Sequence, residues 1–306
     1  MDADDIELLV GTARRVLASG NPTALVDELA EAGIAATAEV TAALLRTQGE
    51  ELARSTLLDL VLAGADHRRD LRVVLPVPGR STPPARRVGA RLDVDGIVLV
   101  PEGAGTLLTH SGGEAYVVPA GMLRIEAAAG FDPALGMAAV RGEFPADLPL
   151  AGRHWEQVAE IAGRALAHEL VGVGERARRV AMAHVEQRRQ FGRPIGALQT
   201  VRHRLVDVHV ELQAARAVLA AVDRADRPDE IDLRAAKASA GRAALTAVAL
   251  AQQVCGAMGF TAEFGLHAIV RRAYLLDSLL GGADDIEFEL GGLLAARGTA
   301  VAVPVL

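Results

Sequence analysis

The stretch RRQFGRPIGALQ, residues 188–199, interrupts the longest helical pattern in the chain. It contains three arginines, a phenylalanine, two glycines and a proline, and it lies between segments rich in Ala, Val and Arg. Glycine and proline are the residues that most often end or break a helix. The stretch therefore predicts a sharp turn between two long helices, with cationic, aromatic and amide side chains gathered at the turn.

The sequence on both sides of this turn has helical periodicity. Residues 154–188 predict one helix of roughly 50 Å, at about 1.5 Å per residue. A second helix begins near Gln199 and ends at 226–228, and one apolar stripe of it comprises Val201, Leu205, Val208, Leu212 and Ala215. Three more helices are predicted at about 230–256, 263–280 and 284–297. Short connections between long amphipathic helices predict an antiparallel four-helix bundle.

The pattern divides the chain into three parts. Residues 1–68 carry helical segments such as ALVDELAEAG and predict a reduced helical N-terminal domain. Residues 69–152 contain short apolar runs bounded by Gly, Pro and Asp, such as ARLDVDGIVLV and EAYVVPAG, which predict a small antiparallel β domain. Residues 153–306 form the helical bundle. The expected fold class is mainly α with a small β domain.

Composition narrows the class of protein. The chain has 306 residues, is 51% hydrophobic and can bury a sizeable core. Its net charge is −7, and the absence of a concentrated basic stripe disfavours a nucleic-acid partner. The single cysteine, Cys255, excludes an internal disulfide and suits a reducing cytoplasm. The N-terminus is acidic where a signal peptide is basic, and no apolar run approaches membrane-spanning length, so we expect a cytoplasmic protein without a membrane partner.

Two segments of the bundle resemble motifs of the acyl-CoA dehydrogenase family. RRQFGRPIGALQTVRHRLVD, from residue 188, is similar to the family's Arg-x-x-Phe-Gly…Gln segment. AQQVCGAMGFTAEFGLHAIVRRA, residues 251–273, is similar to its Gln-x-x-Gly-x-x-Gly segment. Each motif alone is typical of an ordinary helix end or a buried amide, but together, in this order and about 60 residues apart, they are specific. The order of helical, β and bundle parts is that of the same family.

The resemblance implies a role in holding FAD. Arg188 is expected to pair with the FAD pyrophosphate, because a guanidinium fork matches phosphate oxygens. Phe191 is expected to pack against the dinucleotide, and Gly256 to permit close backbone approach. In this family these residues reach across a subunit interface to the FAD of the neighbouring subunit. The full set of implied cofactor contacts is Arg188, Gln190, Phe191, Gln199, Gln253, Gly256 and Ala257, the last standing where the family often has glycine.

The same resemblance exposes a missing catalytic base. The family's reaction is α,β-desaturation of an acyl-CoA thioester, in which a glutamate removes the α-proton and the β-hydrogen passes to the flavin as hydride. The two positions that carry this glutamate in the family correspond to Leu280 and Ala162 here. Neither residue can accept a proton, so no catalytic residue and no metal are assigned. Carboxylates near those positions do not match the family pattern: Glu160, Glu169, Asp277, and Asp284 with Asp285, which suit the N-cap and first turn of the last helix.

Other family motifs are also missing. The flavin-cradling Thr-Glu-Pro…Gly-Ser-Asp segment is replaced by LPVPGRSTPPARRVG, and the single tryptophan, Trp155, begins the bundle. This combination resembles the shortened partner subunit of heteromeric acyl-CoA dehydrogenases of actinobacterial sterol side-chain degradation. The resemblance implies a longer sister subunit that supplies the base and flavin cradle, an α₂β₂ assembly with one FAD per heterodimer, a bulky steroid-type acyl-CoA substrate, and an electron-transfer flavoprotein or similar acceptor.

Two alternatives remain open. The chain could be a self-sufficient homo-oligomeric dehydrogenase with a relocated carboxylate base, for which Asp277 and Glu169 are the candidates. It could also be a scaffold that assembles without a cofactor. The joint retention of Arg188, Phe191 and Gln199 argues against the scaffold.

Overall fold

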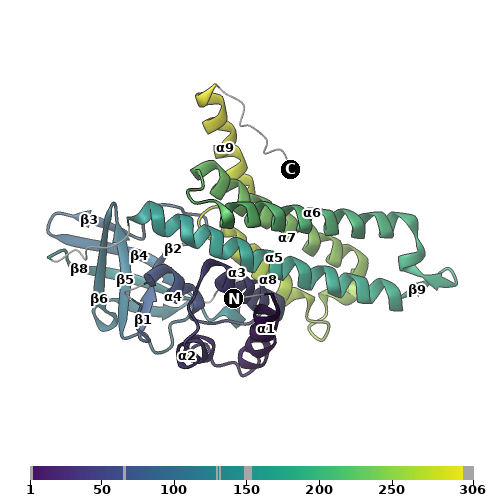
Figure 1. Cartoon of the computed structure of the whole chain (residues 1–306), viewed down its shortest axis with the longest axis horizontal. Helices are drawn as coiled ribbons and strands as arrows, with labels where there is room; N and C mark the ends of the chain where they lie inside the picture. Colours follow the sequence, from purple (N-terminus) through teal and green to yellow (C-terminus); the bar gives the residue numbers. More distant parts are fainter. Residues whose placement is uncertain (1–2, 65–66, 129, 131, 148–153, 299–306) are drawn as a thin grey trace.

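The computed structural model describes residues 3–64, 67–128, 130, 132–147 and 154–298. A long helical bundle runs across the molecule, with the β part at one end of it and the first four helices against its side (Figure 1). The predicted fold class is confirmed. The division into three domains stays a prediction, and its boundary at residues 152–153 lies outside the described residues.

Four helices precede the strands: α1 (Ala3–Leu17), α2 (Ala24–Glu31), α3 (Ala38–Glu51) and α4 (Leu57–Ala63). Helix α3 begins where the Thr37 hydroxyl accepts a hydrogen bond from the Val40 amide, 3.3 Å away. It ends at Leu52, whose φ of 51° is left-handed. Helix α3 packs along the first bundle helix and so joins the N-terminal helices to the main core.

The β part consists of two sheets. One has the strand order β1 (Leu71–Val73), β5 (Thr106–Ser111) and β6 (Glu114–Pro119). The other contains β2 (Leu75–Pro76), β4 (Arg91–Val98), β8 (Ala138–Pro145) and β7 (Arg124–Ala127), with β3 (Ala85–Val88) also paired to β4.

The expectation of purely antiparallel sheets is wrong in one place, because β1 and β5 run parallel. The segment between these strands, which includes β2 to β4, is long enough for the crossover that a parallel pair needs. The remaining pairs of both sheets are antiparallel.

The bundle agrees with the predicted helices. Its members are α5 (Trp155–Gln187), α6 (Gln199–Arg224), α7 (Glu230–Cys255) and α8 (Leu266–Ser278), followed by α9 (Ala283–Arg297). A reciprocal capping box starts α7. The Asp229 side chain accepts a hydrogen bond from a backbone amide of the first turn, and the Asp232 side chain accepts one from the Asp229 amide. Helix α7 packs against α5, α6, α8 and α9, which explains why its sequence is apolar nearly all round.

Because of that composition, the segment Glu230–Phe260 also has the length and hydropathy of a helix that could cross a membrane. Within the described residues it is the one segment that meets this criterion, contrary to the expectation that none would. A core helix of a globular bundle has the same properties, and α7 occupies that position here.

Glycine permits a close contact between α3 and α5. A Cβ atom at Gly172 would overlap the Arg46 carbonyl oxygen, and a Cβ atom at Gly49 would overlap the Glu169 carbonyl oxygen. The two glycines thus let the two backbones touch directly.

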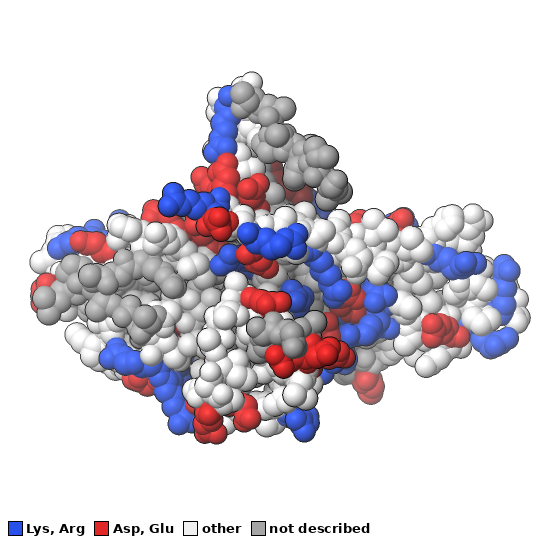
Figure 2. Space-filling model, in the orientation of Figure 1, with Lys and Arg blue, Asp and Glu red and all other residues white. Residues whose placement is uncertain are grey.

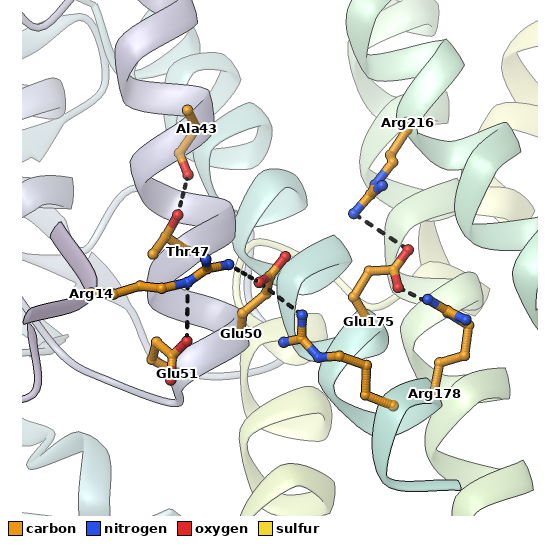
Figure 3. A network of polar contacts seen from close by, with 9 residues as sticks. Arg14, Ala43, Thr47, Glu50, Glu51, Glu175, Arg178 and Arg216 are labelled. Carbon is orange, nitrogen blue, oxygen red and sulfur yellow. Dashed lines mark hydrogen bonds and ion pairs between the residues drawn. The ribbon is translucent and has the colours of Figure 1, made fainter. Parts of the chain in front are cut away.

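Ion pairs next to this crossing join four helices (Figure 3). Glu50 of α3 accepts from Arg14 of α1 at 2.9 Å and from Arg179 of α5 at 3.0 Å. Glu175 of α5 pairs with Arg178 of the same helix at 2.9 Å and with Arg216 of α6 at 3.3 Å.

Candidate functional site

The predicted turn forms the end of the bundle furthest from the β part (Figure 1). Helix α5 ends at Gln187, and the chain turns through a hairpin of β9 (Arg189–Gln190) and β10 (Arg193–Pro194) before α6 begins at Gln199. The Ile195 amide donates to the Arg188 carbonyl at 2.8 Å and closes the base of this hairpin. We call residues 182–210 together with 256–260 the bundle tip.

Phe191 occupies the apex of the hairpin in an unusual conformation. Its φ is 51°, in the left-handed region that an aromatic residue seldom adopts, and Gly192 follows with φ 77°. The side chain is 90% exposed. A strained backbone that presents a large apolar side chain to solvent is more typical of a binding surface than of a core.

The second predicted motif lies at the same end of the bundle. Helix α7 ends at Cys255, and a short 3-10 helix, η5 (Gly256–Phe260), leads toward α8. The His184 ring on the last turn of α5 meets the Phe264 ring edge to face, with centroids 5.9 Å apart. Burial, and next the nearby Arg188 guanidinium, lower the pKa of His184. The fold therefore brings together two segments that are about 60 residues apart in sequence.

Most of the predicted cofactor contacts in these motifs are exposed to solvent. Gly256 has a φ of 54° and open space beside its Cα, so it leaves room for a ligand as well as for the turn. Cys255 is buried, which raises the pKa of its thiol, and it packs as a core residue. The exposed members of the predicted set are Arg188, Gln190, Phe191, Gln199, Gln253 and Ala257.

A second candidate site is a cavity of about 380 Å³ at the opposite end of the bundle, where α5 and α7 meet the β part. Leu280, one of the two residues that the resemblance predicts at the position of the base, lines it, and its φ of 60° is left-handed. Trp155 lines another wall and donates its indole N–H to the Ser81 carbonyl at 3.0 Å. Trp155 thereby anchors the Pro-rich segment that includes Ser81.

Several carboxylates line this cavity, and neither Glu169 nor Asp277 is among them: they are Glu156, Glu160, Glu230, Asp285 and Glu289. Ala162, the other base position, is fully buried in the core and does not line the cavity. Glu160 does line it. Burial, and next the negative charge of Glu230, raise the pKa of Glu160. Glu160 lies two residues before Ala162, about 200° round the helix, and that angle turns it from the core to the cavity.

The two carboxylates proposed as relocated bases have structural surroundings instead. Glu169 is buried, and its Oε2 accepts from the Gln48 amide at 3.0 Å. Asp277 accepts from the Ala283 amide at 3.2 Å and so caps the first turn of α9. Burial raises the pKa of both carboxyls. Neither lines the cavity beside Leu280.

The first turn of α9 differs slightly from the prediction. The helix begins at Ala283 with Gly282 at the N-cap position, so Asp284 and Asp285 both lie in the first turn and neither is the N-cap. Asp284 pairs with Arg242 of α7 at 2.7 Å.

Lys237, the single lysine of the chain, holds the loop that carries Leu280. Its Nζ donates to the carbonyl oxygens of Asp277 at 2.9 Å and Gly281 at 2.7 Å. Burial lowers the pKa of Lys237 to about 8, against the opposing effect of Asp277. A helical sequence pattern gives no signal for this contact, because the two carbonyls belong to the last turn of α8 and to the loop after it, 40 and 44 residues further along the chain.

Comparison with known proteins supports the resemblance. Residues 162–292 match the family model for the acyl-CoA dehydrogenase C-terminal domain. The acyl-CoA dehydrogenase IpdE2 of Mycobacterium tuberculosis is 36% identical over 117 residues, or 38% of this chain and 36% of that protein. IpdE2 of Mycolicibacterium smegmatis is 32% identical over 124 residues, or 40% of this chain and 39% of that protein. The matches thus span less than half of these relatives.

Solved structures match over nearly the whole chain. A steroid acyl-CoA dehydrogenase, the Tcur3481-Tcur3483 G363A variant, has a TM-score of 0.77 at 23% identity, with 97% of this chain and 99% of that chain covered. The ChsE4-ChsE5 complex of Mycobacterium tuberculosis has a TM-score of 0.78 at 22% identity, with 98% and 99% covered. These matches establish an acyl-CoA dehydrogenase fold and confirm the predicted resemblance.

Proposed function

We propose that this chain is a subunit of a heteromeric FAD-dependent acyl-CoA dehydrogenase, and that its bundle tip holds the FAD of a longer sister chain. The observation that carries the proposal is the contrast between the two ends of the bundle. One end presents Arg188 and Phe191 to solvent on a shaped hairpin. The other end has a leucine, Leu280, at a position where the family carries its base.

The bundle tip suits a dinucleotide. The Arg188 guanidinium is exposed and has no carboxylate partner among the described residues, so its charge is available to a pyrophosphate. Gln199 and Gln253 offer exposed amides, and Gly256 leaves open space. FAD, when bound, would supply the hydride acceptor for α,β-desaturation. The part of this chain is to bind and orient the dinucleotide.

The need for a sister chain follows from the carboxylates. Glu169 and Asp277 are committed to buried structural contacts, so the proton acceptor is expected on the partner. The solved structures named above include a two-component steroid enzyme and a two-component complex, which supports an α₂β₂ assembly and a steroid-type acyl-CoA substrate for this chain too. An electron-transfer flavoprotein as acceptor and a cytoplasmic location remain parts of the proposal.

Glu160 favours a second candidate, a dehydrogenase that needs no sister. It shares the cavity with Leu280, and its raised pKa is the property expected of a general base. In that case Glu160→Gln would abolish turnover by the isolated chain, whereas Glu169→Gln would not remove the base. If the isolated chain has no turnover, this candidate is excluded.

The deciding experiment is to measure flavin content and assembly mass for the chain alone and after co-expression with its sister chain. We expect a colourless isolated chain and a yellow heterotetramer with one FAD per pair. Arg188→Ala should remove most of the FAD from the heterotetramer. Arg224→Ala is the matched control, because Arg224 is also exposed and lies at the other end of α6. Unchanged FAD content and activity in Arg188→Ala would favour the scaffold alternative.

A further inference from the structure

Positive charge is concentrated at the bundle tip. Residues 187–206 contain five arginines and neither Asp nor Glu, although the whole chain carries a net charge of −7. Basic side chains gather at the end of the bundle that carries β9 (Figure 2). The expectation of no concentrated basic region is therefore wrong locally, since the turn and the start of α6 bring these arginines together. They are Arg188, Arg189, Arg193, Arg202 and Arg204.

These arginines also lack ionic partners. Many arginines elsewhere are paired with a carboxylate, as Arg14 is with Glu50 (Figure 3). At the tip, none of the five arginines forms an ion pair within the described part of the chain; Arg189 only donates to the Gly192 carbonyl at 3.4 Å. Uncompensated charges of one sign repel one another, and a ligand of opposite sign relieves this repulsion.

Exposed apolar side chains lie among these charges. Phe191 at the hairpin apex is joined by Phe260 on η5, which is 76% exposed, and by Val206 on α6. Exposed arginine mixed with aromatic and aliphatic side chains, and without lysine, is the composition of protein–protein interfaces. The largest exposed apolar side chains of the tip are Met182, Phe191, Val206, Val210, Met258 and Phe260.

From these observations we propose that Arg189, Arg193, Arg202 and Arg204 form a docking face for an acidic surface of the sister chain. The inference rests on the proposed function and adds a means of partner recognition to it. A pyrophosphate carries two negative charges, which Arg188 and one neighbouring arginine could neutralise. The other arginines of the bundle tip would then still carry uncompensated positive charge.

The spread of these arginines favours a protein over a second phosphate ligand. Arg202 and Arg204 are two residues apart, about 200° round the helix, and cannot converge on one phosphate. Arg189 and Arg193 lie on the separate strands of the hairpin. An acidic surface that wraps round the hairpin and the start of α6 can contact all four, and its attraction would steer association and fix the register of the two chains.

The test uses the complex purified after co-expression with the sister chain. Its dissociation constant would be measured at 50 and 300 mM NaCl for two double variants, Arg189→Glu/Arg193→Glu and Arg202→Glu/Arg204→Glu. The matched control is Arg224→Glu/Arg227→Glu, which makes the same charge change on exposed arginines at the end of α6 and in the connection that follows it. Arg189→Lys/Arg193→Lys preserves the charge.

We expect each tip double variant to weaken assembly at least about tenfold at low salt, with the control and the lysine variant within about twofold. High salt should weaken the wild-type complex more than the tip variants. Salt screens the attraction between the arginines and the acidic surface, and the tip variants have already lost that attraction. Wild-type affinity in the tip variants, or equal weakening in the control, would overturn the docking proposal.

The failure of the docking proposal can be separated from the failure of the proposed function. If Arg188→Ala loses FAD while the tip variants assemble normally, the docking proposal alone is wrong. If the isolated chain binds FAD and turns over acyl-CoA, the proposed function is wrong.

Two other results would assign the face to a different occupant. Salt-sensitive self-association of the isolated chain that the tip variants abolish would assign the face to a second copy. Binding of the isolated chain to phosphatidylserine vesicles, lost in the tip variants, would assign it to a membrane. Either result overturns the docking proposal.

Discussion

Glu169 of α5 and Arg272 of α8 face each other in the interior, with Oε1 of the glutamate 3.5 Å from a terminal guanidinium nitrogen of the arginine. The same guanidinium bonds to the Asp132 carboxylate through its Nε, 2.5 Å away, and donates to the Ala53 carbonyl at 2.7 Å. One buried arginine thus joins the bundle, the end of α3 and a loop of the β part.

Removing this guanidinium is expected to be strongly destabilising. Arg272→Ala would leave the buried carboxylates of Glu169 and Asp132 without their cation, which typically costs about 3–5 kcal/mol. The free energy of unfolding from urea titration would measure the effect. Arg271→Ala is the control, since its side chain is exposed and surface substitutions usually change stability by less than about 0.5 kcal/mol. Equal effects of the two variants would show that the buried junction contributes little.

The close crossing of α3 and α5 makes a second prediction. Gly172→Ala would push a methyl group into the Arg46 carbonyl, so the helices must separate, at a cost of about 1–3 kcal/mol or more. Gly163→Ala, on the same helix, has only the Lys237 side chain near, at 3.7 Å, and should stabilise the helix by about 0.5–1 kcal/mol. Thermal unfolding of both variants should therefore shift in opposite directions. A stabilised Gly172→Ala would contradict the tight crossing.

Sequence periodicity predicted most of the fold because the bundle helices bury long apolar stripes. Helices α5, α6 and α7 begin and end within a residue or two of the predicted positions, where Gly, Pro and Asp interrupt the pattern. The parallel pairing of β1 with β5 could not be predicted in this way. Strand periodicity shows which side chains share a face, but the partner of a strand depends on long-range contacts.

The candidate site was only partly predictable. Motif spacing indicated Arg188 and Phe191, and both lie exposed at the bundle tip. The choice among carboxylates was less successful, since sequence distance from Ala162 does not reveal which side of α5 faces a cavity. Glu160 faces that cavity, whereas Glu169 lies among buried partners from α3 and α8.

The buried lysine predicts a specific pH dependence. Burial lowers the pKa of Lys237 from 10.5 to about 8, so between these values the unfolded chain holds a proton that the native chain has released. Stability rises with pH wherever the unfolded state binds more protons. Relative to Lys237→Met, the wild-type free energy of unfolding should therefore increase by about 3 kcal/mol between pH 8 and 10.5. Urea titrations of both proteins at several pH values test this, and parallel pH curves would refute it.

The conformation of Phe191 predicts that stability and flavin binding will respond in opposite ways. Phe191→Gly removes an exposed side chain from a left-handed position, φ 51°, that glycine adopts without strain, so unfolding should become about 0.5–1 kcal/mol less favourable. The same change removes the proposed dinucleotide contact, and the flavin content of the assembled complex should fall. Leu52→Gly is the control, because Leu52 has the same φ of 51° at the end of α3, away from the tip. Full flavin content in Phe191→Gly would mean that the strained hairpin has no part in holding FAD.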